Sequence, residues 1–363
     1  GQAGTMQYSR EPDYLTTLAD GTVKQLNPFT GTEVWTVPGR GNRPLGLGGV
    51  NAKPLDPDKH GAYCSFCEKR YEETPPEKSR VVHRGNTTWE THYRTPAEEM
   101  YNTVADFRRV PNLFEILSYE YWNLNYGYTL PTHIAGRREA YLASPAGRAH
   151  VLSVVDMKLK ASGLSAAKVA AMAEDERIAA ASGFFGGGHD LIIARRHFTD
   201  GATDDAQLAG AGTLTPDEHA QFTTYTIESV KGLYDLNRYA RYVTVFQNWL
   251  KPAGASFDHL HKQLVAIDEH GEQLEQEIRR LRENPNMYNE FAVDYAARHN
   301  LVIAENDHAV AFAGFGHRYP TLEIHSKSPT CEPWRQTPEE VAGMSDLIHA
   351  CHAAAGPDVP CNE

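Results

Sequence analysis

The sequence has little cysteine and no long apolar run, and both absences narrow the class of protein that it encodes. Five cysteines at uneven spacing in 363 residues exclude a disulfide scaffold and indicate a reducing cytoplasm. No apolar stretch approaches the roughly 20 residues of a membrane-spanning helix. No basic segment followed by an apolar core marks a secretory signal at the N-terminus. We therefore expect a cytoplasmic protein with no membrane partner.

Positive charge is scarce as well. The chain has 35 Lys and Arg residues against 47 Asp and Glu residues, a formal net charge of −12. Proteins that bind nucleic acid need an excess of basic side chains on their surface. The composition therefore excludes a general nucleic-acid surface, although it leaves room for a small basic pocket that binds one nucleotide. The length is sufficient for one large domain or two of ordinary size.

The stretch from Ser256 to Val265 carries polar side chains at alternate positions. A strand over residues 258–266 would place His259, His261 and Gln263 on one face. Two imidazoles and an amide are costly to bury without partners. One interpretation is a polar edge of a core strand. The pattern occurs in the same chain as a Cys-x-x-Cys motif, and the two together favour a chemical role.

That motif is Cys64-Ser65-Phe66-Cys67. Two thiolates at this spacing suit a tetrahedral zinc ion. The chain has no second Cys-x-x-Cys, so histidines would have to supply the remaining ligands. A thioredoxin-type redox pair and a metal-free pair of buried cysteines are the alternatives, and we place zinc ahead of both.

Two helices are predicted from the same start signal. Thr215-Pro216-Asp217-Glu218 and Thr337-Pro338-Glu339-Glu340 each combine an N-capping threonine, a proline in the first turn and acidic residues near the positive end of the helix dipole. The first helix should run to about Leu236, and Gly356 should cap the second. A strand and a loop precede each helix, so the order suggests an internal duplication.

The rest of the chain divides by composition. Residues 119–187 resemble an insertion, with a helix from about Ser165 to Ala181. Residues 269–299 are charged and predicted to form a linking helix. Residues 301–304 and 309–312 should form a hairpin. Residues 1–25 are expected to be a tag remnant and an N-terminal arm, with Met6 as the natural start.

The chain resembles the galactose-1-phosphate uridylyltransferase branch of the histidine-triad (HIT) superfamily, and within it an actinobacterial-looking subgroup. The resemblance covers about residues 26–268, interrupted by the 119–187 insertion, and the second half more weakly. No single motif is specific, but their order is. The motifs are Asn27-Pro28-Phe29-Thr30-Gly31, Val37 to Pro44, Cys64-x-x-Cys67, Asn112-Leu113-Phe114, Val245-Phe246-Gln247-Asn248 and Ser256 to Gln263.

The resemblance implies an α+β fold of two HIT-like halves, each a mainly antiparallel sheet with helices. Residues 26–268 would form the first half, with the zinc site and the catalytic strand. Residues 300–363 would form a second half that is incomplete at its C-terminal end. It also implies a homodimer.

The family's functional residues transfer onto matching positions of this chain. The resemblance implies a structural zinc ion held by Cys64, Cys67, His197 and His259. It implies a nucleophile, His261, with Gln263 and Ser256 orienting a phosphate. It further implies nucleotide contacts from Arg40, Arg43, Asn112 and Asn248. Arg40 and Arg43 lie in a Gly-rich turn, where arginines can fork onto phosphate oxygens, although a solvated surface turn is the alternative.

The implied activity is transfer of a nucleoside monophosphate, through a covalent nucleotidyl-histidine, between a nucleoside diphosphate sugar and a sugar 1-phosphate. A phosphorylase or hydrolase acting on nucleotide sugars or dinucleoside polyphosphates is an alternative. A zinc-stabilised nucleotide-binding module without turnover is another. Three positions depart from the family: Asp258 and Leu260 replace prolines, and Lys262 replaces a small or polar residue. Nothing in the sequence selects uridine or galactose.

Overall fold

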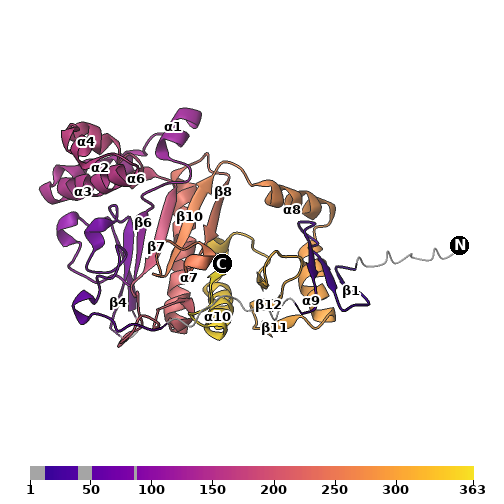
Figure 1. Cartoon of the computed structure of the whole chain (residues 1–363). Helices are drawn as coiled ribbons and strands as arrows, with labels where there is room; N and C mark the ends of the chain where they lie inside the picture. The colour runs from indigo at the N-terminus through magenta and orange to yellow at the C-terminus, as the bar shows by residue number, and fades with distance from the viewer. Residues whose placement is uncertain (1–12, 40–50, 86–87) are drawn as a thin grey trace. The chain divides into compact units, whose positions relative to one another are not determined.

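The computed structural model of the chain describes residues 13–39, 51–85 and 88–363. The chain forms two compact units (Figure 1). Unit 1 comprises residues 1–50 and 270–329, and unit 2 comprises residues 51–269 and 330–363. In the part of the chain that is described, no helix has both the length and the apolar character needed to cross a membrane.

Unit 2 is built on a six-stranded sheet with the strand order β5-β4-β6-β7-β10-β8, in which every neighbouring pair is antiparallel. The strands are β4 (Ser79–Arg84), β5 (Thr88–Tyr93), β6 (Phe107–Pro111), β7 (His189–Ala194), β8 (Tyr242–Phe246) and β10 (His261–Ile267). A two-stranded ladder joins β9 (Asn248–Trp249) to β14 (Cys361–Asn362). Strand β8 lies at one edge of the six-stranded sheet, and β9 follows it closely in sequence. The ladder therefore places Cys361 and Asn362 beside the segment that follows this edge strand.

Helix α7 (Pro216–Leu236) packs on one face of this sheet. Its capping box is complete, since the Thr215 hydroxyl accepts from the Glu218 amide while the Glu218 carboxylate accepts from the Thr215 amide. Phe222, Tyr225 and Leu233 of α7 belong to the largest apolar core cluster, with strand residues such as Ile192 and Leu264. Burial of this helix face therefore fixes which side chains of β7 and β10 are left for the opposite face.

Helix α10 (Pro338–Ala355) also begins with a complete capping box, at Thr337 and Glu340, and ends at Gly356. It packs against α7, where the Ser345 hydroxyl lies 2.6 Å from Nδ1 of His219. Both predicted helix starts are confirmed. Residues 330–363, expected to continue the second half, belong to unit 2, where α10 packs against α7.

The insertion forms a cluster of short helices in unit 2. They are α1 (Tyr119–Tyr126), α2 (Thr132–Ala143), α3 (Pro145–Ala161), α4 (Ala166–Ala171), α5 (Glu174–Ala179) and α6 (Gly183–Gly186). Helices α2, α3 and α6 share an apolar core that contains Val151, Val154 and Phe184. The helix predicted from Ser165 to Ala181 is wrong in its extent: the chain is extended at Met172 and Ala173, so two six-residue helices replace it.

Unit 1 contains two three-stranded antiparallel sheets. One has β1 (Leu15–Thr17), β2 (Val23–Leu26) and β3 (Glu33–Thr36), and the other has β11 (Val302–Glu305), β12 (Ala309–Ala313) and β13 (Leu322–Ser326). The predicted hairpin is confirmed as β11 and β12. The single linking helix is wrong: the chain forms α8 (Glu272–Glu283), a π-helical turn (Asn289–Val293) and α9 (Asp294–Arg298). Asn284 and Pro285 interrupt it, since a proline disfavours helical backbone in the residue before it.

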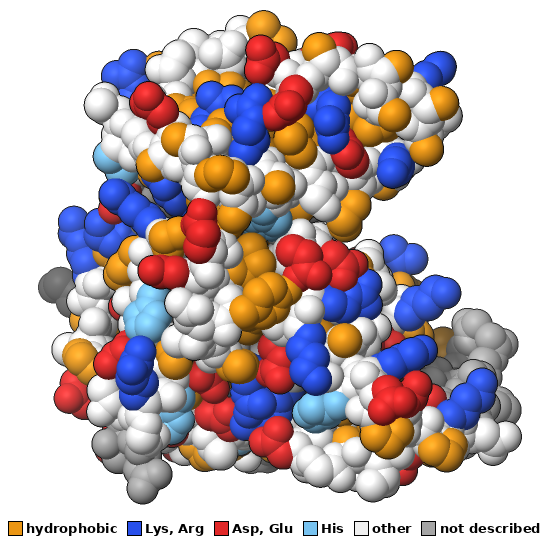
Figure 2. Space-filling model, turned by 90° about the vertical axis from the view of Figure 1, so that its left-hand side faces the viewer, with side chains coloured by type: hydrophobic (Ala, Val, Ile, Leu, Met, Phe, Trp, Pro, Cys, Tyr) orange, Lys and Arg blue, Asp and Glu red, His pale blue; other side chains and the backbone are white. Residues whose placement is uncertain are grey.

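Short 3₁₀ turns complete the described structure at Pro57–Lys59, Tyr71–Glu73, Ala97–Glu99, Ala211–Thr213, Lys251–Ala253 and Pro333–Arg335. Antiparallel sheets with helices packed on them confirm the expected α+β class. Figure 2 shows Lys and Arg side chains interspersed with Asp and Glu on one face of the molecule.

Candidate metal centre and active site

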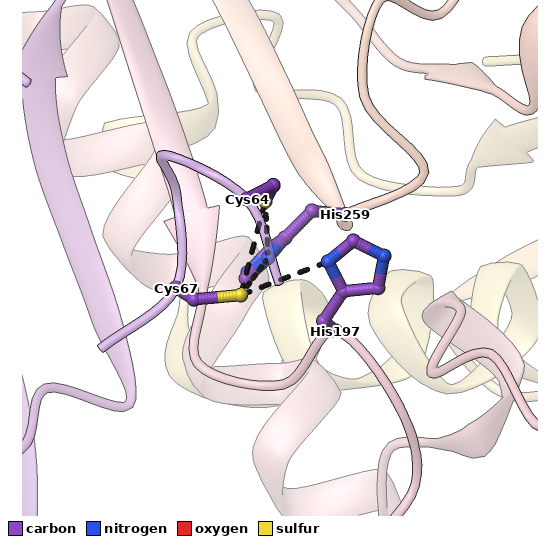
Figure 3. A group of neighbouring side chains, drawn as sticks. All are labelled: Cys64, Cys67, His197 and His259. Atoms are coloured by element: carbon purple, nitrogen blue, oxygen red, sulfur yellow. Dashed lines mark hydrogen bonds between the residues drawn. The ribbon is translucent and has the colours of Figure 1, made fainter. Parts of the chain in front are cut away.

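The structure brings four predicted metal ligands together at one end of the sheet in unit 2. Cys64 and Cys67 lie in a tight turn, where the Cys67 amide donates to the Cys64 carbonyl oxygen over 3.0 Å. His197 follows β7 and His259 precedes β10. The two sulfur atoms and one nitrogen from each imidazole all lie within 4.8 Å of one another. Figure 3 shows the four side chains converging from these three segments.

The separations fit a tetrahedral ion. Zinc–sulfur bonds of about 2.3 Å place two sulfurs about 3.8 Å apart, and a sulfur and an imidazole nitrogen about 3.5 Å apart. The Cys64 and Cys67 sulfurs are 3.8 Å apart. Nδ1 of His259 lies 3.5 Å from the Cys64 sulfur and 3.7 Å from the Cys67 sulfur. Nδ1 of His197 lies 3.7 Å from the Cys67 sulfur. The donor set could therefore hold a metal, and its chemistry suits zinc.

A contact outside the ligand set fixes the tautomer of His259. Its Nε2–H donates to the carbonyl oxygen of Ala194, so Nδ1 keeps the lone pair that faces the two cysteines. The hydrogen bond from the Cys64 thiol is the main cause of the lowered pKa of Cys67. The thiolate form of Cys67 is therefore favoured even without a bound metal ion.

The same contact corrects the predicted strand. Residues 258–260 are not part of β10, which begins at His261. The amide of Ala194 donates to the Leu260 carbonyl, but the Ala194 carbonyl accepts from the His259 ring rather than from a backbone amide. The ladder between β7 and β10 therefore begins at the His261–Ile193 pair. His259 reaches the metal cluster because it is outside the pleat.

His261 is the first residue of β10 and is 6% exposed. Its Nδ1 lies 2.7 Å from the backbone carbonyl oxygen of His259. A carbonyl can only accept, so Nδ1 carries the proton and Nε2 keeps a lone pair. The ring packs edge-on against Phe66, with centroids 5.1 Å apart. Burial lowers the pKa of His261, so the neutral ring is favoured.

Gln263 lies two residues further along the same face of β10. Its Oε1 is 3.0 Å from Nε2 of His189 and 3.5 Å from Nδ2 of Asn112. Asn112 and Gln263, both predicted from the family motifs, are thus in contact. His189 belongs to none of the sequence motifs. It follows three glycines in the sequence, but no pattern links it to Gln263.

The remaining predicted site residues are Ser256, Asn248, Arg40 and Arg43. Ser256 is exposed and has no hydrogen bond from its side chain to another described residue. Oδ1 of Asn248 accepts from Nδ2 of Asn362 over 2.7 Å, within the β9–β14 ladder. Arg40 and Arg43 lie outside the described residues.

Lys262, one of the departures from the family pattern, is explained by the opposite face of β10. Its side chain is buried there and forms an ion pair with the Glu363 carboxylate. Glu363 also accepts from Nε2 of His352 over 2.8 Å. The lysine amine lies 5.1 Å from the centre of the Phe222 ring. Lys262 therefore ties β10 to β14 and α10, and its side chain lies on the face away from His261.

Comparison with solved structures supports the fold. An ADP-glucose phosphorylase from Arabidopsis thaliana with bound ADP-glucose is similar over 90% of this chain and 74% of its own, with a TM-score of 0.51 and 16% identity. A GalT-like protein from the same plant is similar over 83% of this chain and 74% of its own, with a TM-score of 0.49 and 17% identity. The first match shows that the chain shares the fold of this ADP-glucose phosphorylase.

Comparison of sequences places the chain more directly. No curated protein gives a match. The family model described as "Domain of unknown function (DUF4921)" matches residues 18–363, so the chain belongs to this family.

Proposed function

We propose that the chain is a nucleotidyltransferase that carries a nucleotidyl group on Nε2 of His261. The observation that carries the proposal is the hydrogen bond from Nδ1 of His261 to the carbonyl oxygen of His259. It leaves Nε2 as the free, unprotonated nitrogen, which is what a nucleophilic imidazole needs. The fold shared with a phosphorylase of ADP-glucose supports this choice of chemistry.

The reaction divides into two displacements at the α-phosphorus of a nucleoside diphosphate sugar. In the first, the lone pair of Nε2 attacks phosphorus, and the bond from phosphorus to the bridging oxygen breaks. The sugar 1-phosphate leaves with the electron pair. In the second, a phosphate oxygen of an acceptor attacks the same phosphorus, and the phosphorus–nitrogen bond breaks. The hydrogen bond to the His259 carbonyl stabilises the charge that the ring gains between the two steps.

Gln263 would act on the same phosphoryl group. Its amide can donate to a non-bridging oxygen while negative charge develops there. Losing one such donor typically lowers kcat by about 10²- to 10³-fold. Asn112, Asn248 and Ser256, with Arg40 and Arg43, are proposed as further contacts to the nucleotide and its phosphates.

The metal site would support this chemistry without taking part in it. Cys64, Cys67, His197 and His259 would hold a structural zinc ion, since four protein ligands leave no open position. His259 contributes its ring to that site and its carbonyl oxygen to His261. Loss of the ion should therefore displace the carbonyl that orients the nucleophile.

The acceptor is proposed to be a sugar 1-phosphate, with inorganic phosphate as the second candidate because one solved structure with the same fold is a phosphorylase. Water as acceptor would make the protein a hydrolase, and a binding module would not turn over. We also propose a homodimer. Light scattering tests the dimer, and product analysis with each acceptor separates the reactions.

Covalent trapping tests the proposal. The protein is incubated with ADP-glucose or UDP-glucose labelled at the α-phosphorus and then denatured. We expect label that is lost in acid and kept in base, as for a phosphoramidate, and located by mass spectrometry on the peptide that contains His261. The His261→Ala variant should take up no label while keeping its metal and its melting temperature. His133→Ala, which removes an exposed histidine of α2, is the matched control and should label normally.

Two results would overturn the proposal. One is the absence of label with both nucleotide sugars and with the corresponding diadenosine and diuridine polyphosphates. The other is label in the His261→Ala variant at the level of the unmutated protein. The first would favour the binding module, and the second would move the nucleophile elsewhere.

A further inference from the structure

His189 occupies a buried position beside Gln263, on the face of the sheet that carries His261. It is the first residue of β7 and is 2% exposed. In the antiparallel register His189 lies opposite Val265. This pair is two residues along the strands from the pair formed by Gln263 and Leu191. Side chains two residues apart on a strand share a face, so His189 and Gln263 are diagonal neighbours across β7 and β10.

Both ring nitrogens of His189 have assigned partners. The backbone amide of Ile116 donates to Nδ1 over 3.1 Å. Nδ1 must therefore be the acceptor nitrogen, and the proton of the neutral ring lies on Nε2. Nε2 is 3.0 Å from Oε1 of Gln263. The chain backbone at Ile116 thus makes His189 a donor toward the glutamine, and burial of the ring favours its neutral form by lowering its pKa.

Asn112 supports the same orientation. Its Oδ1 accepts from the amide of Phe114 over 2.9 Å, which turns its Nδ2 toward Oε1 of Gln263 at 3.5 Å. Nδ2 of Asn112 also lies 3.2 Å from Nε2 of His189. Both of these atoms are donors, so this contact forms no hydrogen bond. Two donors face the carbonyl end of the glutamine, and no hydrogen bond holds its NH₂ to another described residue.

We propose that His189 is a positioning residue that holds the side-chain amide of Gln263 with its NH₂ group free to donate to the phosphoryl oxygen. The inference rests on the proposed nucleotidyl transfer. A glutamine amide can turn by half a rotation about its last bond, which exchanges its oxygen and nitrogen. The reversed amide would set NH₂ against the Nε2–H of His189 and would point its carbonyl oxygen at the phosphoryl group. Each is an unfavourable pairing, and His189 therefore selects the productive orientation.

Two substitutions separate positioning from packing. His189→Leu removes both the donor nitrogen and the acceptor nitrogen of the ring. His189→Gln keeps a side-chain amide, whose NH₂ group can donate and whose oxygen can accept. The rate of labelling of the protein by α-labelled ADP-glucose or UDP-glucose is measured under single-turnover conditions. We expect His189→Leu to slow labelling about tenfold or more at saturating nucleotide, with little change in the concentration that gives half-saturation. His189→Gln should recover most of the rate.

A double-mutant cycle with Gln263→Ala gives the readout that a purely structural role would not produce. If His189 acts through the glutamine, His189→Leu should cause little further loss once Gln263 has been replaced by alanine. Independent losses that multiply would overturn the inference. Metal content and melting temperature are measured for each variant, so that loss of folded protein is not counted as loss of rate.

Nitrogen NMR with ¹⁵N-labelled histidine tests the geometry without turnover. We expect the proton of His189 on Nε2 and an unprotonated Nδ1, and a proton on Nδ1 would overturn the inference. In the labelling arm, an undiminished rate for His189→Leu would overturn the inference alone. Absence of label in the unmutated protein would overturn the proposed function, and the positioning role with it.

Discussion

The backbone carbonyl of His259 holds Nδ1 of His261 at 2.7 Å, while the ring of His259 faces Cys64 and Cys67. One residue therefore connects the candidate metal centre to the candidate nucleophile. The two histidines are separated by a single residue, but only His261 belongs to β10. This division of roles has consequences that can be measured.

The first prediction concerns the metal. We expect about one zinc ion per chain in protein purified without chelator, because the donor set and its separations suit a tetrahedral site. Cys64→Ser should lose the ion and lower the melting temperature, since binding of a structural metal is part of the folding free energy. Elemental analysis and calorimetry check both. Cys331→Ser, at an exposed cysteine remote in sequence, is the control and should retain the ion. Metal-free protein that melts at the same temperature as the unmutated protein would refute the site.

Substitution of each histidine by alanine should give different defects. His259→Ala removes a metal ligand and should lower metal content, stability and nucleotidylation together. His261→Ala removes the nucleophile and should abolish nucleotidylation alone. Metal analysis, thermal melting and covalent labelling on the same samples provide the comparison. Equal metal loss in both variants would contradict the separate roles.

The buried charge cluster behind the site should contribute strongly to stability. Asp190, with no exposed side-chain surface, is ion-paired with Lys78 and Arg109 at 2.8 Å each. Asp190→Ala leaves two cations without a counter-charge and should lower the free energy of unfolding by about 3 to 5 kcal/mol. Asp235→Ala breaks an exposed pair with Lys231 and should cost about 0.5 kcal/mol or less. Urea unfolding of both variants tests this, and similar small losses would contradict it.

Glu115 should make stability depend on pH. Burial raises its pKa from 4.5 to about 8, against the opposing effect of Lys78 and Lys158, while Asp190 and Glu120 raise it further. Its carboxylate also lies against Gly183 and Gly187, where an added Cβ would be 1.8 Å and 2.3 Å from Oε1. A carboxyl whose pKa is higher in the folded state stabilises the fold below its unfolded pKa. That contribution is lost as the pH rises from about 4.5 to about 8.

Replacement of this carboxyl isolates its contribution. Glu115→Gln should lose stability less steeply than the unmutated protein over that interval, whereas the exposed Glu176→Gln should follow the unmutated protein. Melting temperatures measured at intervals between pH 4.5 and pH 8 give the comparison. Parallel curves for Glu115→Gln and the unmutated protein would show that Glu115 stays ionised.

Local sequence signals predicted those parts of the protein that depend on local interactions. The capping boxes at Thr215 and Thr337 are short-range patterns, and both helices start where expected. The four candidate ligands were found because the spacing of Cys64 and Cys67 and the order of the family motifs are visible in the chain. The α+β class followed from the same resemblance.

Features set by long-range contacts could not be read in the same way. The start of β10 depends on the His259 ring replacing a backbone amide at Ala194, which only the folded chain reveals. The role inferred for His189 depends on the Ile116 amide and on Gln263, both more than 70 residues away in sequence. The packing of α10 on α7 is likewise a tertiary contact, and it groups residues 330–363 with unit 2.

Chemical rescue of a His261→Gly variant tests the central claim most directly. Glycine removes the imidazole and leaves a space that free imidazole can enter. We predict that the variant forms no covalent nucleotidyl-protein and does not turn over a nucleotide sugar. Addition of imidazole should restore transfer by forming a nucleotidyl-imidazole in solution, detectable by mass spectrometry. Turnover by the glycine variant at the unmutated rate without imidazole would contradict a covalent mechanism at His261.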